Sequence, residues 1–124
     1  MNGSQQDSKS FEIARRFLGT RVHLRFDQPI GSSHAPFGIT SYPVNYGYVP
    51  GVPAPDGDDL DAYYLGTSTP LDEADGVCIA IVHRLNDDDD KLVVVPEGVS
   101  LSDEEISSQV RFQEQYFLSE IRRK

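Results

Sequence analysis

The chain has 124 residues, of which 20 are acidic and 11 basic, and its formal net charge at pH 7 is −9. This length predicts one domain, expected over residues 1–124, with room for a hydrophobic core. The acidic balance argues against nucleic-acid binding through a general basic surface and against docking on anionic lipid.

The compartment is predicted from three features of the sequence. One cysteine, Cys78, excludes an intramolecular disulfide, and its apolar surroundings, VCIAIV, favour a core position. No apolar run approaches the ~20 residues that a membrane-spanning helix needs. The first ten residues, MNGSQQDSKS, lack the basic and then apolar pattern of a signal peptide. We therefore expect a cytoplasmic protein with neither a membrane nor a nucleic-acid partner.

The N-terminal third predicts a short helix and one strand. Residues 1–9 are polar, and we expect them to be frayed. Residues 10–19 predict a helix with Ser10 as N-cap and Gly19 as its end. The segment RVHLRF, residues 21–26, alternates between polar and apolar side chains, which is typical of a half-buried strand.

The middle of the chain predicts a long loop followed by strands. Residues 43–59 carry four prolines and three glycines, which favours loop. LDAYYLG, residues 60–66, and GVCIAIVHR, residues 76–84, predict strands, the second buried on both faces. The acidic turn NDDDD separates the latter from a further strand, KLVVVP, at residues 91–96.

The last segment, from Ser102, predicts a long helix. Ser102 and Glu105 have the spacing of a capping box. An apolar stripe continues along the segment through Ile106, Val110, Phe117 and Ile121. The basic residues 122–124 suit the C-terminal end of a helix dipole. These patterns predict a small antiparallel sheet or barrel packed by a terminal helix.

Two acidic clusters precede predicted strands. The first, DGDDLD, contains Asp56, Asp58 and Asp61, and the second spans residues 87–90. If the two strands are neighbours, both clusters meet at one end of the sheet. Carboxylates about 4 Å apart repel by roughly 4 kcal/mol at an effective dielectric of 20. Such a cluster needs a divalent cation or raised pKa values, and hard oxygen ligands favour Mg²⁺, Mn²⁺ or Ca²⁺. The alternative is a solvated Asp-Gly turn.

An EF-hand does not fit the first cluster. That calcium loop requires Gly at its sixth position and Glu at its twelfth. Counted from Asp56, these positions hold Asp61 and Thr67.

The order of three motifs resembles the soluble, magnesium-dependent inorganic pyrophosphatases. The motifs are YPVNYGYVP, DGDDLD and DDKLVVVP, and the clear resemblance spans about residues 42–96. It implies a small OB-like five-stranded barrel with a short N-terminal and a longer C-terminal helix, of mainly β or α+β class. It also implies Mg²⁺-dependent hydrolysis of pyrophosphate to two phosphates and a homo-oligomer.

The resemblance also implies roles for individual residues. The implied metal ligands are Asp56, Asp58, Asp61, Asp87 and Asp89. The implied catalytic residues are Asp58, which helps to deprotonate the attacking water, together with Lys91 and Tyr46. The implied substrate contacts are Tyr42, His34, Lys91 and Tyr116.

The chain departs from the family in its cations. The segment from Phe26 to His83 contains neither Lys nor Arg, and His34 stands where the family has an arginine. The remaining candidates for phosphate contacts are Lys91, Arg84, Arg25 and His34. Two alternatives therefore stay open: a weak or inactive relative that binds a phosphate-containing metabolite, and a hydrolase of another phosphoric anhydride.

Overall fold

The fold is described from a computed structural model, for residues 8–34 and 38–124. The described residues form two α-helices, a 3-10 turn and six strands. In chain order these are α1 (Lys9–Ala14), η2 (Arg15–Phe17), β1 (Arg21–Gln28), β2 (Asn45–Pro53), β3 (Asp59–Tyr64), β4 (Glu73–Arg84), β5 (Lys91–Val95), α2 (Asp103–Glu114) and β6 (Ser119–Arg122). Most of the segment expected to be frayed, residues 1–7, lies outside the described residues.

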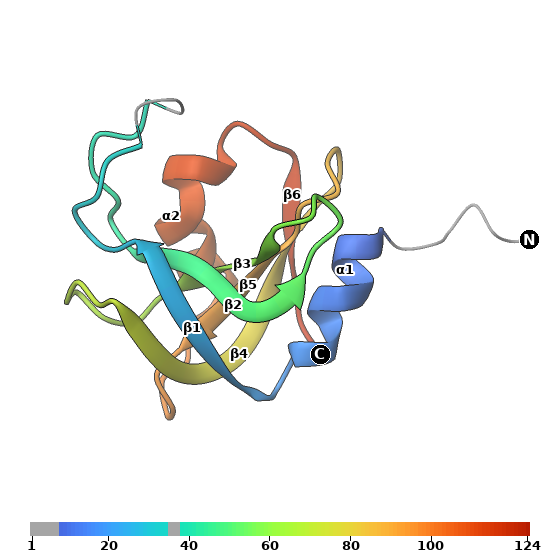
Figure 1. The fold of residues 1–124 in the computed structure, drawn as a ribbon, viewed down its shortest axis with the longest axis horizontal. Helices are drawn as coiled ribbons and strands as arrows, with labels where there is room; N and C mark the ends of the chain where they lie inside the picture. The colour runs from blue at the N-terminus through green and yellow to red at the C-terminus, as the bar shows by residue number, and fades with distance from the viewer. Residues whose placement is uncertain (1–7, 35–37) are drawn as a thin grey trace, which may run out of the picture.

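Five of the strands close into a barrel (Figure 1). The sheet order is β1-β2-β3-β5-β4-β6, and β1 also pairs with β4, so β6 lies outside the closed ring. The predicted five-stranded barrel with a short N-terminal and a longer C-terminal helix is therefore confirmed. The predicted antiparallel pairing fails at one place, because β3 and β5 are parallel neighbours.

Apolar side chains fill the barrel and also cover part of its outside. Inside, Leu24, Leu60 and Leu92 are fully buried, and Phe11 of α1 packs against the same cluster. Outside, Ile106 and Val110 of α2 pack in a second cluster with residues of β3, β4 and β5. Strand β5 is buried at all its positions because it faces both clusters.

Strand β2 corrects the prediction that residues 43–59 are mostly loop. Gly47 pairs with Ala62 of β3, and a Cβ on Gly47 would lie 1.8 Å from the Arg25 carbonyl oxygen. The glycine is thus required for close approach of two strands and does not mark a turn. The ladder with β3 shifts register between Tyr48 and Pro53, which accommodates the prolines that cannot donate hydrogen bonds.

The helix boundaries also differ from the predicted ones. Ser8 caps α1 by accepting a hydrogen bond from the Phe11 amide, while Ser10, the predicted cap, is buried inside the helix. The capping box of Ser102 and Glu105 is confirmed, but α2 ends at Glu114.

The segment after α2 is a strand and not the predicted continuation of the helix. Ile121 pairs with Val82 of β4, and the basic residues 122–124 lie in and beyond β6. Pairing with β4 supplies the backbone hydrogen bonds of this segment, so that it forms a strand. The apolar stripe in the sequence predicts a helix because it carries no information about this distant pairing. No helix among the described residues combines the length and the apolar character needed to cross a bilayer.

Candidate active site

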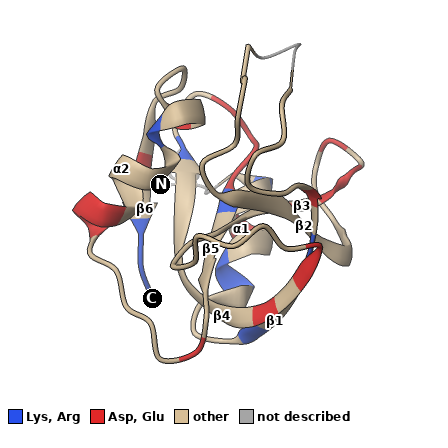
Figure 2. Ribbon diagram, turned by 90° about the vertical axis from the view of Figure 1, so that its left-hand side faces the viewer, with Lys and Arg blue, Asp and Glu red and all other residues tan. Residues whose placement is uncertain are grey.

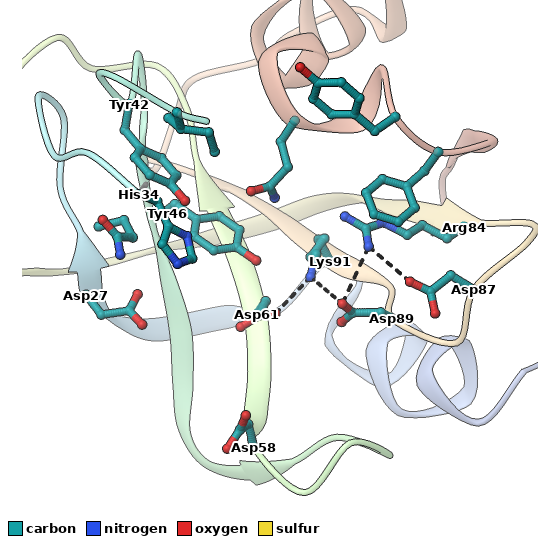
Figure 3. A pocket seen from close by; sticks show the side chains of 15 residues that line it. Asp27, His34, Tyr42, Tyr46, Asp58, Asp61, Arg84, Asp87, Asp89 and Lys91 are labelled. Carbon is teal, nitrogen blue, oxygen red and sulfur yellow. Dashed lines mark hydrogen bonds and ion pairs between the residues drawn. The ribbon is translucent and has the colours of Figure 1, made fainter. Parts of the chain in front are cut away.

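One pocket of about 790 Å³ collects most of the predicted site residues (Figure 3). Its wall is formed by residues of β1, β2, β3 and β5, the end of β4, the loop after β1, the turns before β3 and β5, and the segment around the end of α2. The lining residues are Asp27, Gln28, His34, Ile39, Tyr42, Tyr46, Asp58, Asp61, Arg84, Asp87, Asp89, Lys91, Gln113, Tyr116 and Phe117. Outside the pocket, acidic positions lie at the start of α2, on loops and at strand ends, and basic positions lie on α1, on β1 and along the C-terminal segment (Figure 2).

The two acidic clusters meet through Lys91, because the condition set by the sequence is met and β3 and β5 are neighbours. Because β3 and β5 are parallel, with Ala62 opposite Leu92, Asp61 and Lys91 lie side by side. The Lys91 Nζ lies 2.8 Å from an Asp61 carboxylate oxygen and 2.9 Å from an Asp89 oxygen. The Lys91 side chain is buried, with 3% of its surface exposed, whereas both carboxylates are about one-third exposed. A single ammonium thus neutralises part of a carboxylate pair at the pocket wall.

Neighbouring charges keep Lys91 charged, and burial keeps Tyr46 neutral. Burial by itself lowers the pKa of Lys91, but Tyr46, Asp61 and Asp89 outweigh it and the net shift is upward. The pKa of Tyr46 is raised, chiefly by burial, and the Lys91 charge lowers it only in part. At neutral pH the pocket therefore offers an ammonium and a protonated phenol, two donors suited to an anionic oxygen.

Arg84 is a second buried cation in the pocket wall. Its Nε and Nη2 donate to the two carboxylate oxygens of Glu114 at 3.1 and 2.9 Å. Its Nη1 lies 3.2 Å from Asp87 and 3.5 Å from Asp89, and its Cζ lies 3.6 Å from the centre of the Phe117 ring. From the sequence, Arg84 is one of four candidate cations for phosphate contacts. Its position at the end of an apolar run does not predict which residues its side chain contacts.

Tyr42 and Tyr46 lie on the side of Lys91 that is away from Arg84 (Figure 3). The rings of Tyr42 and Tyr46 stack with centres 5.9 Å apart. His34 lines the pocket from the loop after β1, with Asp27 at the end of that strand. The pKa of Asp27 is raised, first by burial and further by the Asp61 charge, although its own backbone and His34 oppose the shift.

The remaining predicted residues occupy the pocket unequally. Asp58 lines it but lies away from the group around Lys91 (Figure 3). Asp56 is not among the lining residues, and its Oδ1 accepts a hydrogen bond from the Asp58 amide at 3.0 Å. Tyr116 lines the pocket from just beyond α2 and not from within a helix as predicted, and it is 70% exposed. Asp87 lines the pocket beside Arg84.

The last aspartate of the acidic run, Asp90, is a structural residue. It is fully buried and accepts hydrogen bonds from the Arg84 amide at 3.0 Å and pairs with His83 Nδ1 at 2.8 Å. Its own amide donates to the Ser10 hydroxyl at 3.1 Å, and the Ser10 amide donates to Asp88 at 2.9 Å. These contacts tie the turn before β5 to α1, and so hold Asp89 and Lys91 in place.

The donors in the pocket fit a hard divalent cation in their chemistry. They are mainly carboxylate oxygens, and the sulfur of Cys78 is buried in the barrel core, with a pKa raised to about 12, mainly by burial. In residues 8–34 and 38–124, however, no three His, Cys, Asp or Glu side chains converge to form a metal-binding group. The Lys91 ammonium stands between Asp61 and Asp89, where two of the predicted ligands come together.

The fold is that of inorganic pyrophosphatases. Solved structures with this fold include the enzyme of Ehrlichia chaffeensis, with a TM-score of 0.67, 16% identity and coverage of 83% of this chain and 85% of that one. The Helicobacter pylori enzyme has a TM-score of 0.64 and 16% identity, with coverage of 84% of this chain and 85% of that one. The Neisseria gonorrhoeae enzyme has a TM-score of 0.58 and 21% identity, with coverage of 86% of this chain and 81% of that one. At these identities the likeness concerns the fold alone.

The chain belongs to the inorganic pyrophosphatase family, because the family model described as inorganic pyrophosphatase matches residues 5–123. No curated protein sequence matched it. The resemblance seen in the three sequence motifs is thereby confirmed over nearly the whole chain.

Proposed function

We propose that this protein hydrolyses inorganic pyrophosphate to two phosphates with the help of Mg²⁺. The observation that carries the proposal is the pocket, in which residues of all three family motifs line one cavity: Tyr46 from the first, Asp61 from the second and Lys91 from the third. The family match supports the same reaction.

The charge of the pocket explains why a divalent cation is part of the proposal. Five carboxylates line it, those of Asp27, Asp58, Asp61, Asp87 and Asp89. Two side chains that are permanently cationic at neutral pH, Arg84 and Lys91, face them. With all five acids ionised, the difference is three negative charges, so a polyanion enters only if further cations accompany it. Bound Mg²⁺ would supply that charge and lower the pKa of a bound water.

Among the acidic residues that line the cavity, Asp58, Asp61 and Asp89 would hold the cation, with Asp56 as a further predicted ligand. Asp58 accepts the proton of the attacking water as the new phosphorus–oxygen bond forms and the bridging bond breaks. Lys91 and the protonated Tyr46 contact phosphoryl oxygens on which negative charge is concentrated. The space in which the substrate is oriented is lined by Tyr42, His34 and Tyr116.

The test is phosphate release from pyrophosphate by the purified protein in Mg²⁺ and in excess chelator. Asp58→Asn should abolish release and leave the fold intact, since Asp58 lies on an exposed turn. Asp59→Asn is the matched control, because it removes the same charge from the adjacent residue. Asp59 accepts a hydrogen bond from the Gly51 amide and does not line the pocket. Full activity of Asp58→Asn, or equal losses in both variants, would contradict the assignment.

One observation favours a second candidate, a phosphate-binding protein with little or no turnover. Lys91 already neutralises part of the charge of Asp61 and Asp89, and within residues 8–34 and 38–124 the predicted metal ligands do not converge. Such a protein would bind a phosphate-containing metabolite without releasing phosphate. Binding measured by calorimetry, together with no release in the phosphate assay, would distinguish it from an enzyme. The volume of the pocket also leaves room for a larger phosphoric anhydride, which hydrolysis of a nucleoside triphosphate would reveal.

The predictions of a cytoplasmic location, of a homo-oligomer and of no nucleic-acid or membrane partner stay predictions. Fractionation of cells that express the protein tests the first. The mass of the purified protein in solution tests the second.

A further inference from the structure

The pocket wall contains a guanidinium whose two edges have different partners. Arg84 projects from the end of β4, and only 4% of its side chain is exposed. One edge faces Glu114, which is itself 5% exposed, and the other faces Asp87 and Asp89 at the cavity (Figure 3). Since Arg84 and Lys91 are the only lysine or arginine side chains among the described residues that line the pocket, the edge of Arg84 that faces the cavity matters for any anionic ligand.

The inner edge is fixed in position. Both oxygens of Glu114 accept from Arg84, and one of them also accepts from the Tyr63 hydroxyl at 2.7 Å. The Phe117 ring covers the flat face of the guanidinium at 3.6 Å. Burial by itself lowers the pKa of Arg84, but Glu114 and then Asp89 outweigh it, so the group stays charged. The guanidinium is therefore held in one orientation before any ligand arrives, which reduces the entropy lost on binding.

The outer edge is held weakly by comparison. Its Nη1 lies 3.2 Å from Asp87 and 3.5 Å from Asp89, longer than the roughly 2.7–2.9 Å of a strong charge-assisted hydrogen bond. Asp89 already has a shorter contact, 2.9 Å, with Lys91. Asp87 has 42% of its side chain exposed and lies in the turn between β4 and β5. Asp87 is thus the partner that can be displaced with least disturbance.

We propose that Arg84 is a substrate-binding residue whose Nη1 edge takes a phosphate oxygen, and that Asp87 is its displaceable counter-ion and not a metal ligand. A phosphate oxygen carries more charge than a carboxylate oxygen and suits the planar donor fork of arginine. The exchange keeps the inner pair with Glu114 and the contact between Asp89 and Lys91 intact. It supplies a cationic contact in a pocket to which the segment from Phe26 to His83 contributes neither Lys nor Arg. This inference rests on the proposed function, since it concerns a ligand containing phosphate.

The test uses methylenediphosphonate, in which a carbon bridge replaces the bridging oxygen, so that binding is measured without hydrolysis. Its dissociation constant is measured by calorimetry in Mg²⁺ for the wild type, Asp87→Asn and Asp88→Asn. Asp88→Asn is the matched control because it removes the same charge from the same turn, but Asp88 accepts a hydrogen bond from Ser10 and does not line the pocket. We expect Asp87→Asn to bind several-fold more tightly than Asp88→Asn, with its affinity for Mg²⁺ alone unchanged.

A second variant tests Arg84 directly. Arg84→Lys keeps a charge but cannot contact Glu114 and the ligand together, so its affinity for methylenediphosphonate should fall about ten- to a hundredfold. If that variant unfolds, the double variant Arg84→Gln with Glu114→Gln replaces both buried charges and keeps the measurement feasible. An unchanged affinity in the folded variant overturns the proposal.

The outcomes separate this inference from the proposed function. Weaker binding of Mg²⁺ and of methylenediphosphonate by Asp87→Asn would show that Asp87 is a metal ligand, and overturn the inference. Equal affinities in Asp87→Asn and Asp88→Asn, or no binding by the wild type, would overturn it as well. Tighter binding by Asp87→Asn in a protein that releases no phosphate from pyrophosphate would support the inference and contradict the proposed reaction.

Discussion

The pair of carboxylates joined by Lys91 allows a quantitative prediction about stability and metal binding. In Lys91→Met the apolar stem is kept and the ammonium is lost. The two oxygens that Nζ contacts, on Asp61 and Asp89, lie at distances of 2.8 and 2.9 Å from it, so they are at most about 6 Å from each other. At an effective dielectric of 20, two unit charges at that separation repel by about 3 kcal/mol.

The expected loss of unfolding free energy follows from that value. Breaking a fully buried ion pair costs about 3–5 kcal/mol, and the partial exposure of both carboxylates lowers this figure. We therefore expect Lys91→Met to lose about 2–3 kcal/mol in the presence of a chelator. The exposed pair of Arg21 and Glu97 provides the control, since Arg21→Met removes a surface ion pair worth about 1 kcal/mol or less.

Magnesium should reverse much of this loss. With the ammonium removed, a divalent cation can bind the two carboxylates without a competitor, and a ligand at 100 times its dissociation constant stabilises the folded state by about 2.7 kcal/mol. The assay is denaturant unfolding of the wild type and both variants, each in chelator and in saturating Mg²⁺. An unchanged stability of Lys91→Met in chelator would refute the electrostatic reasoning. If Mg²⁺ stabilises Lys91→Met no more than it stabilises the wild type, the idea that Mg²⁺ and the Lys91 ammonium occupy the same position between Asp61 and Asp89 is refuted.

Further predictions concern the backbone, a titrating acid and a helix cap. Gly47→Ala should prevent folding or cost several kcal/mol, because its Cβ would meet the Arg25 carbonyl oxygen at 1.8 Å; yields of soluble protein and melting temperatures test this. The pKa of Asp27 is raised in the folded state, so its neutral form is favoured there and stability is lost as pH rises through the folded pKa. Asp27→Asn should therefore be more stable than the wild type at pH 7, and the advantage should disappear below pH 3.8; equal melting curves at both pH values would contradict this. Ser102→Ala removes the acceptor of the Glu105 amide and should cost about 1 kcal/mol in denaturant unfolding.

The candidate site could be predicted in large part because its motifs are contiguous. Asp58 and Asp61 lie within one short run, and Asp89 and Lys91 are two residues apart, so alternation along a strand puts Asp89 and Lys91 on one face. That the runs meet was conditional on β3 and β5 being neighbours, which the sheet order now establishes. The roles assigned to these residues stay predictions, since they concern ligands.

Arg84 shows what local patterns could not supply. Its partners Glu114 and Phe117 lie about 30 residues away, and neither its burial nor its bidentate contact follows from the sequence around it. The meaning of Asp87 changes with it, from a member of an acidic run to the neighbour of a buried guanidinium.

The amino-acid sequence by itself determined the features that depend on neighbouring residues: the alternation of β1, the capping box of α2, the acidic turn before β5 and the order of the family motifs. Only the tertiary structure decided that the glycine- and proline-rich segment forms β2, that β3 and β5 run parallel, and that the chain after Glu114 becomes β6. The physical reason is the same in all three cases. Strand pairing is a contact between segments distant in sequence, and the hydrogen bonds and burial that it provides override the local preference for loop or helix.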